Sequence, residues 1–360
     1  MLLAFVFLLF SPLINAVSTN FFLKIHYPDK HFDKSRRLLI DIACSNGFFM
    51  DANSFPDLLY ELAINTTESK TFKSLEIPFA NNYTLPWNVK ESAIYGTVAT
   101  DKLSLKKLEF EARFGLVNKI RGEPTEGIYG QLGVGRVGFS RNNQSATALR
   151  DSILAAIGTK VLCLSAETTD DGKLRSTLVS LGKVPFPSPD LILKTKSQDN
   201  VGDLWQLNVT SIQTGSYFSK IAIPAAFSTA LNGIAGPERV VLPLVKALNA
   251  KYDKNRKEYI FPCLQEINPI FLGLNGAVVK LDRHSFSEPV NENDCQAKFS
   301  ITSENRIILG SSIFLNRGFC FDFGYEEISV YKTKRNSHRI IQKNAAKDAN
   351  SIVFVEKFKH

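Results

Sequence analysis

Two short loops hold the residues that could carry out acid–base chemistry. Asp41 directly follows the apolar run 38–40, and Ser228 comes shortly after the apolar run 221–223. The sequences of the two loops are Asp41-Ile42-Ala43-Cys44-Ser45-Asn46 and Ser228-Thr229-Ala230. Two facing carboxyl groups can share one proton, hold a water molecule and activate it for hydrolysis. Here one carboxyl and one hydroxyl occupy the two positions, so a hydrolytic site of this kind would lack half of its acid–base pair.

The segments that must position these loops have the alternation typical of β-strands. In residues 108–116, and again in 319–325, apolar side chains occupy every second position. Asn-Gly and Asp-Gly pairs, which form turns, recur between such runs. Two helices are expected, at 146–157 and at 237–248. The sequence therefore predicts an all-β class, mostly β with a few short helices.

A weak internal repeat of about 180 residues divides the chain. Each half begins with an apolar strand that runs into one of the two loops, and each later has an apolar-apolar-Gly step, at 127–130 and 307–310. Two similar β lobes would place the loops face to face across a cleft. The three prolines of 185–189 predict the linker, because proline interrupts strand pairing. The expected lobes are residues 17–188 and 189–330.

The N-terminus predicts entry into the secretory pathway. Residues 1–16 resemble a signal peptide, with an apolar stretch at 2–10 and cleavage after Ala16. The alternative is an N-terminal membrane anchor, but the stretch is short for a bilayer span. We expect a secreted, soluble, monomeric protein without a stable membrane span. Four sequons predict N-glycosylation, at Asn65, Asn82, Asn143 and Asn208.

Five cysteines fit an oxidising compartment. Cys263 and Cys295 flank strand-like segments in one half of the chain, and we expect them to form a disulfide. The pairing of Cys44, Cys163 and Cys320 stays open. Because the number of cysteines is odd, at least one remains a thiol, and we interpret it as a buried, unreactive cysteine.

Most of the net charge of +8 lies at the C-terminus. Residues 331–360 hold eight Lys or Arg and two Asp or Glu, so the body of the protein is close to neutral. This distribution argues against a nucleic-acid-binding surface. We expect the extension to be an exposed tail, polar and flexible at 332–349, with a possible short strand at 352–355. The alternative is a segment that binds an acidic partner or a membrane surface.

Two weaker patterns carry no prediction of a cofactor or a metal. Residues 133–138 match Gly-x-Gly-x-x-Gly, but no βαβ unit surrounds them, so a glycine-rich turn is the better interpretation. His26 and His31 stand close together without the Cys/His spacing of a zinc site.

An ordered series of motifs resembles the pepsin-like aspartic proteases over nearly all of residues 20–330. The first loop is similar to the family's Asp-Thr-Gly-Ser-Ser-Asn loop, and the second to its Asp-Thr-Gly-Thr loop. The other matching segments are 126–130, 202–207, 234–237, 259–263 and 308–322. The resemblance implies a bilobal fold with two β-barrel-like lobes around a cleft, and it also implies the disulfide between Cys263 and Cys295.

The same resemblance implies that catalysis is impaired. In the family, one aspartate per lobe contributes to a dyad that activates water. Asp41 retains the first, Ser228 replaces the second, and the supporting positions carry Ile42, Ala43, Cys44, Ser45, Thr229 and Ala230. The hairpin flap that covers the family's cleft is expected to be shortened after Trp87.

Three functions follow as hypotheses. The first is a pseudoprotease that binds a peptide or protein in its cleft. The second is an active aspartic endopeptidase at acidic pH, for which 204–237 offers no substitute Asp or Glu near Ser228. The third is a secreted structural or storage glycoprotein.

Overall fold

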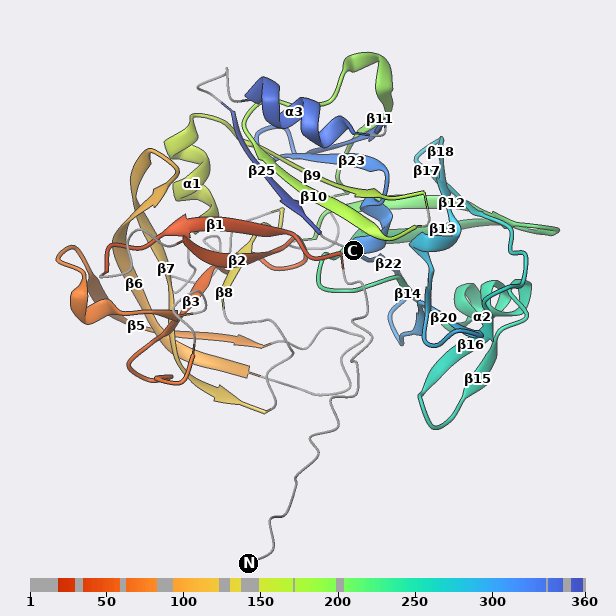
Figure 1. The fold of residues 1–360 in the computed structure, drawn as a ribbon, viewed down its shortest axis with the longest axis horizontal. Coiled ribbons are helices and arrows are strands. Elements are labelled where there is room, and N and C mark those ends of the chain that lie inside the picture. Colours follow the sequence, from red (N-terminus) through yellow and green to blue (C-terminus); the bar gives the residue numbers. More distant parts are fainter. Residues whose placement is uncertain are drawn as a thin grey trace, which may run out of the picture.

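The computed structural model describes residues 19–29, 35–58, 63–82, 93–122, 130–136, 149–170, 172–198, 204–334, 336–345 and 351–358. Strands dominate these residues, so the predicted mostly β class is confirmed. Figure 1 shows strands from the first half of the chain on the left, those from the second half on the right, and a further sheet between them at the top. Short 3-10 helices lie at Thr66–Glu68, Ser188–Asp190, Arg283–Ser285 and Ser311–Phe314.

The first half of the chain forms an eight-stranded sheet in the order β1-β2-β8-β3-β7-β6-β5, with β4 paired to β3. The alternation predicted at 108–116 is confirmed, because Phe110, Ala112 and Phe114 of β7 are buried. Helix α1 (Leu149–Ile157) contacts β7. The strands are β1 (Phe22–His26), β2 (Ser35–Asp41), β3 (Phe48–Asp51), β4 (Ala63–Ile64), β5 (Lys73–Asn82), β6 (Ala93–Leu105), β7 (Leu108–Arg121) and β8 (Gly130–Gly133).

The second half forms a seven-stranded sheet, in the order β18-β17-β12-β13-β22-β14-β21, and a four-stranded sheet, β15-β16-β20-β19. Helix α2 (Glu238–Ala247) begins after Pro237 and ends before Leu248, as predicted. The strands are β12 (Gln206–Thr214), β13 (Tyr217–Phe227), β14 (Ile234–Gly236), β15 (Lys251–Asp253), β16 (Glu258–Pro262), β17 (Ile270–Leu274), β18 (Ala277–Leu281), β19 (Ser287–Pro289), β20 (Asp294–Ala297), β21 (Phe299–Ile301) and β22 (Ile307–Leu309).

A six-stranded sheet, called the central sheet below, takes strands from both halves, in the order β11-β24-β23-β9-β10-β25. The predicted lobe boundary falls between β10 and β11, which are both strands of this shared sheet, and it stays a prediction. The strands are β9 (Val161–Thr168), β10 (Leu174–Leu181), β11 (Leu191–Lys196), β23 (Arg317–Asp322), β24 (Glu327–Lys332) and β25 (Ile352–Lys357).

The prediction of a flexible, exposed C-terminal tail was wrong. Helix α3 (Ser337–Ala345) forms within 332–349, and β25 pairs along the edge of β10. The strand expected at 352–355 is confirmed, two residues longer than predicted. The helix escaped detection because its sequence is polar and buries only His338 and Ile341. The basic composition therefore does not mark a solvated extension.

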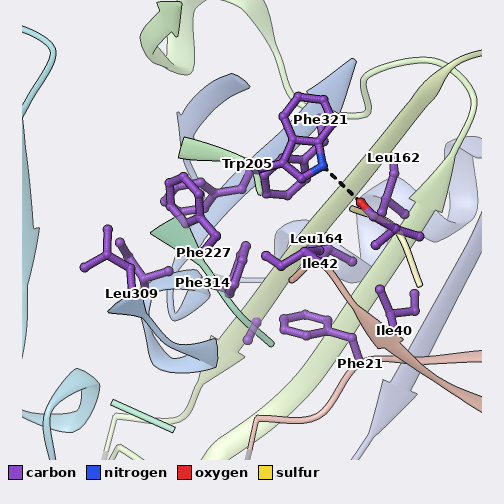
Figure 2. Close-up of a cluster of buried hydrophobic side chains, with 14 of the residues drawn as sticks. Phe21, Ile40, Ile42, Leu162, Leu164, Trp205, Phe227, Leu309, Phe314 and Phe321 are labelled. Carbon is purple, nitrogen blue, oxygen red and sulfur yellow. Dashed lines mark hydrogen bonds between the residues drawn. The ribbon is translucent and has the colours of Figure 1, made fainter. Parts of the chain in front are cut away.

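Aromatic residues fill the core beneath the central sheet. Figure 2 shows Phe321 and Phe227 beside the indole of Trp205, and Phe314 next to Phe21 further along the same cluster. The indole nitrogen donates a hydrogen bond to the carbonyl oxygen of Val134, at 3.0 Å. This bond ties the start of the second half to the end of β8. Edge-to-face ring contacts of this kind add to the stabilisation from burial.

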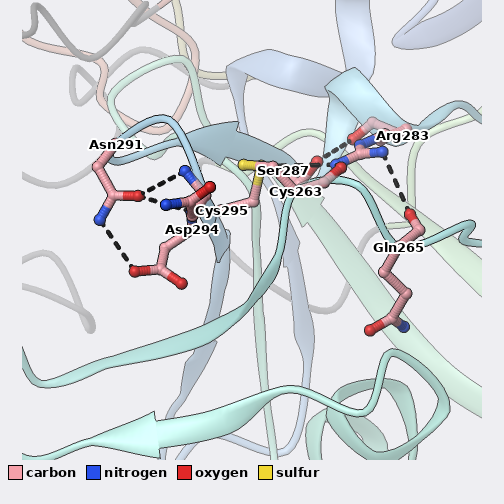
Figure 3. The surroundings of a disulfide bond; sticks show 8 residues. Cys263, Gln265, Arg283, Ser287, Asn291, Asp294 and Cys295 are labelled. Carbon is pink, nitrogen blue, oxygen red and sulfur yellow. Dashed lines mark hydrogen bonds between the residues drawn. A yellow bond between two sulfur atoms is a disulfide. The ribbon is translucent and has the colours of Figure 1, made fainter.

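Two disulfides are present in the described residues. The predicted pair, Cys263 and Cys295, joins the end of β16 to β20, and Figure 3 shows Arg283 beside it. The guanidinium of Arg283 donates to the carbonyl oxygens of Cys263 and Gln265. The second pair, Cys163 and Cys320, links directly opposite residues of β9 and β23. Cys44 remains a thiol.

The two disulfides should contribute unequally to stability. They close loops with sequence separations of 157 and 32 residues. The chain-entropy relation gives about 5 kcal/mol for the longer loop and about 4 kcal/mol for the shorter one. We expect Cys163→Ala/Cys320→Ala to lower the free energy of unfolding, measured by urea denaturation, more than Cys263→Ala/Cys295→Ala does. The two double variants remove the same atoms, so the reverse order would contradict this expectation.

Candidate functional site

The first loop (residues 41–47) connects β2 to β3, and β8 lies between these two strands. β8 pairs in parallel with β2 and antiparallel with β3. The amide of Val134 donates to the carbonyl oxygen of Asp41 at 2.8 Å, and that of Gly133 donates to Asn46 at 3.0 Å. A Cβ atom on Gly133 would lie 2.4 Å from the oxygen of Asn46. Glycine is required there because the loop backbone packs directly against it.

The second loop (residues 228–233) repeats this arrangement. It connects β13 to β14, and β22 lies between them, parallel to β13 and antiparallel to β14. The amide of Ser228 donates to Leu309 at 3.0 Å, and that of Gly310 donates to Gly233 at 2.7 Å. A Cβ atom on Gly310 would lie 2.5 Å from the oxygen of Gly233. The two halves thus contain one repeated strand–loop–strand unit with a third strand inserted.

The strand register places Asp41 and Ser228 at equivalent positions. Ile40 lies opposite Leu132, which precedes Gly133, and Phe227 lies opposite Leu309, which precedes Gly310. Gly133 is therefore the counterpart of Gly310. The predicted repeat, which aligned Gly130 with Gly310, was therefore wrong by three residues. Gly130 packs against Leu38 and not against the first loop. Residues 127–129 lie outside the described residues.

The hydroxyl group of Thr229 joins the two loops. It donates to the carbonyl oxygen of Ile40 at 2.5 Å and accepts from the amide of Ile42 at 3.3 Å. All three residues are buried. Ile42 occupies the position equivalent to Thr229, and its apolar side chain lies in the aromatic core instead (Figure 2). The connection between the loops therefore runs through one hydroxyl group, from the second loop to the first.

The carboxyl group of Asp41 is buried, with 3% of the residue exposed. Its Oδ1 accepts from the amide of Ala43 at 2.9 Å, and its Oδ2 from the side-chain amide of Gln131 at 3.4 Å. Burial raises the pKa of Asp41 to about 6, against a smaller lowering by the hydrogen bond from Ala43. The carboxyl group is thus protonated in mildly acidic solution, since desolvation favours the neutral form.

Ser228 forms the same local turn without a carboxylate. It is fully buried, and its Oγ accepts from the amide of Ala230 at 3.2 Å. This contact is the counterpart of the one from Ala43 to Asp41. The two side chains share no hydrogen bond in the part of the chain that the structure describes. A hydroxyl group can replace the carboxylate in the turn, but it does not ionise in the range where Asp41 titrates.

Cys44, on the first loop with Asp41, contacts Asn81 of β5. The side-chain amide of Asn81 lies 3.7 Å from Sγ of Cys44, and the amide of Asn46 donates to the same sulfur at 3.4 Å. Burial and the nearby Asp41 charge raise the pKa of the Cys44 thiol to about 12. Asn81 belongs to the hairpin of β5 and β6, which is the predicted flap segment. The tip of that hairpin, with Trp87, lies outside the described residues.

The structure also locates several of the predicted glycosylation sites, but it does not test whether they are glycosylated. Asn65 precedes a 3-10 helix and accepts hydrogen bonds from Thr67, and Asn208 lies partly buried in β12. Asn82 ends β5, while Asn143 and the signal peptide lie outside the described residues. Glycosylation at the four sequons stays a prediction. Among the described residues, no three His, Cys, Asp or Glu side chains are grouped as metal ligands would be, and no helix is long and apolar enough to cross a membrane.

Comparison with known proteins identifies the family. Residues 60–333 match the eukaryotic aspartyl proteases. This segment covers most of the chain, so the protein belongs to that pepsin-like family, and the predicted resemblance is confirmed. No curated protein matches the chain significantly. Because the match begins after the first loop, the equivalence of Asp41 and Ser228 rests on the strand register and on the repeated loop connection.

Loss of the Thr229 hydroxyl should destabilise the protein. In Thr229→Val, the carbonyl of Ile40 and the amide of Ile42 lose this partner inside the core, which costs about 2–4 kcal/mol of unfolding free energy. Thr229→Ser keeps the hydroxyl and is the matched control. Urea denaturation of both variants measures the difference. Equal stability of the two variants would show that the bridge between the loops contributes little.

The raised pKa of Asp41 predicts a pH-dependent difference in stability. The pKa is about 6 in the folded protein and 3.8 ordinarily, so folding is favoured by this group below pH 3.8. That contribution, about 3 kcal/mol, is lost as the pH rises through 6. We expect Asp41→Asn, which does not titrate, to gain about this much stability relative to the native protein between pH 3.5 and 7. A constant difference across that range would contradict the raised pKa.

Proposed function

We propose that this protein is a pepsin-like pseudoprotease, without proteolytic activity, that binds a peptide or a segment of another protein between its two lobes. One observation carries the proposal: Ser228 stands where the repeated fold requires the partner of Asp41. The hydroxyl of Ser228 completes the turn but supplies no second carboxyl group. A cleft of this fold suits an extended chain, which gives the proposed class of ligand.

The electrostatic surroundings of Asp41 support the loss of hydrolysis. In an active dyad, the pKa values of two carboxyl groups move apart because they share one proton. Burial alone raises the pKa of Asp41, and among the described residues no acidic side chain contributes to the shift. Asp41 therefore titrates as a single carboxyl group. The loss of one positioned acid or base typically costs about 10²–10⁴-fold in rate.

The neighbouring thiol does not replace the missing group. A cysteine acts as a nucleophile in its thiolate form. The pKa of Cys44, raised to about 12 by burial and by Asp41, keeps it protonated at physiological pH. Attack by Cys44 on a peptide bond would thus require a rare ionisation beside an acidic side chain.

The proposed location is the secretory pathway or the extracellular space. The two disulfides fit an oxidising compartment, and so does the signal-like sequence at 1–16. The binding role would then be exerted on peptides and proteins of the same compartment.

Restoring the second carboxyl group should restore cleavage. We expect no pepstatin-sensitive cleavage of denatured casein by the native protein from pH 2 to 7. The triple variant Ala43→Gly/Ser228→Asp/Ala230→Gly should cleave at acidic pH, at least about 100-fold above the native protein, since it regains the acid–base pair. Peptide release is measured by mass spectrometry.

The control for this experiment is Asp41→Asn in the triple variant, which should abolish the restored cleavage. Pepstatin-sensitive cleavage by the native protein would refute the proposed pseudoprotease. Binding is tested separately, by equilibrium dialysis against casein peptides. Ala43→Arg, at the first loop, should reduce retention, whereas Ala247→Arg, on the exposed end of α2, should not.

A further inference from the structure

The C-terminal elements α3 and β25, together called the strap below, both contact the central sheet. β25 pairs antiparallel with β10 through six residue pairs, from Ser176 and Lys357 to Leu181 and Ile352. The amide of Phe358 donates to the carbonyl oxygen of Arg175 at 3.0 Å. The strap therefore covers an edge of β10 that would otherwise present unpaired backbone groups.

The strap also contacts the eight-stranded sheet. Glu356 forms an ion pair with Arg37 of β2, with 2.8 Å between the charged atoms. The ammonium group of Lys106 donates to the carbonyl oxygen of Val353 at 3.1 Å and lies over the ring of Phe354. Figure 1 shows β25 running beside β10 toward the N-terminal strands. The strap thus connects the first lobe to the central sheet.

A single histidine anchors α3 to a polar patch on the sheet. Ser165 and Glu167 of β9 share one sheet face with Ser176 of β10, because the strand register places Ser176 opposite Glu167. His338 lies over this patch with only 1% of the residue exposed. Its Nδ1 lies 2.9 Å from Oγ of Ser176, and its Nε2 lies 3.0 Å from Oγ of Ser165.

Glu167 also holds the first turn of α3. Its Oε1 accepts from the hydroxyl of Ser337 at 2.8 Å and from the backbone amide of His338 at 2.9 Å. Next to this patch, Ile341 packs in the cluster that contains the Cys163–Cys320 disulfide. The docking of α3 thus combines apolar contacts of Ile341 and Ala345 with a buried polar network centred on the imidazole.

The network fits a neutral imidazole. A neutral ring has one donor and one acceptor nitrogen, and each faces a hydroxyl group that can take either role. Burial lowers the pKa of His338 to about 4, with Glu167 opposing the change and Arg175 of β10 adding to it. On β25, Glu356 is paired with Arg37, and Lys357 is exposed. A charged ring in this place loses more solvation than Glu167 restores.

We propose that the strap is an acid-released clamp: protonation of His338 undocks α3, frees β25 from β10, and uncovers the edge of the central sheet. In the docked state His338 resists protonation, while in the released segment it accepts a proton at its ordinary pKa. Docking is therefore strongest above about pH 6.5 and weakens as the pH falls toward 4. The difference between these two pKa values corresponds to a roughly 300-fold decrease in the docking equilibrium constant.

Hydrogen exchange of the full-length protein, corrected for the intrinsic pH dependence of exchange, tests the clamp. Between pH 7 and 4, protection of β10 and β25 should fall by up to about 100-fold, while that of β12 and β13 stays high. In His338→Asn, which does not titrate here, protection of β10 and β25 should change by less than about 10-fold. Ile341→Ala is the matched control: it should weaken docking by a similar factor at every pH.

Three outcomes would overturn the proposal: unchanged protection of β10 and β25 in the native protein, the same pH dependence in His338→Asn, or equal loss of protection in all sheets. If His338→Asn fails to dock even at pH 7, the ring of His338 is followed by NMR in the native protein. Titration of that ring together with the loss of protection supports the clamp. A ring that titrates while β25 stays protected refutes it.

Discussion

The hydrogen bonds of the Thr229 hydroxyl constrain how the two halves of this protein meet. Each half builds its loop from a strand–loop–strand unit with a third strand inserted, and the two loops are joined where this hydroxyl bridges Ile40 and Ile42. Both backbone groups are buried, so the bridge satisfies polar atoms that lack access to water. The reciprocal contact is missing because Ile42 is apolar, and its burial in the aromatic core replaces a directional bond with packing.

The fold and the chemistry of the site make different demands on the same two positions. For the turn, a side-chain oxygen must accept from the amide two residues later, and Asp41 and Ser228 both do so. Hydrolysis requires in addition that both oxygens belong to ionisable groups that share a proton. The serine hydroxyl group provides the acceptor for the turn, but it does not provide the second ionisable group. The loop can therefore keep its shape without a second carboxyl group, which explains why the surrounding sequence motifs remain recognisable.

The parts of the structure that were predicted correctly depend on local patterns. Alternation marked β7, proline and leucine marked the ends of α2, and the apolar strands before the loops identified Asp41 and Ser228. Gln131 and Asn81 were missed because their contacts with the first loop come from residues distant in sequence, which leave no local signal. Helix α3 was missed for a different reason: its docking depends on His338 meeting Ser165, Ser176 and Glu167, and polar residues of this kind suggest a solvated segment until their partners are known.

Asp41 and His338 are both buried, and burial raises the pKa of Asp41 but lowers that of His338. These opposite shifts together determine how the protein responds to acid. Between about pH 4 and 6, deprotonation of Asp41 increasingly opposes folding as the pH rises, while protonation of His338 increasingly opposes it as the pH falls. For each group, the change of unfolding free energy with pH approaches that of one bound proton, and the two changes have opposite signs. Global stability should therefore vary little over this interval even though each group acts strongly. A local probe of the strap responds mainly to His338, because the carboxyl group of Asp41 is bonded to Ala43 and Gln131, which lie outside the strap.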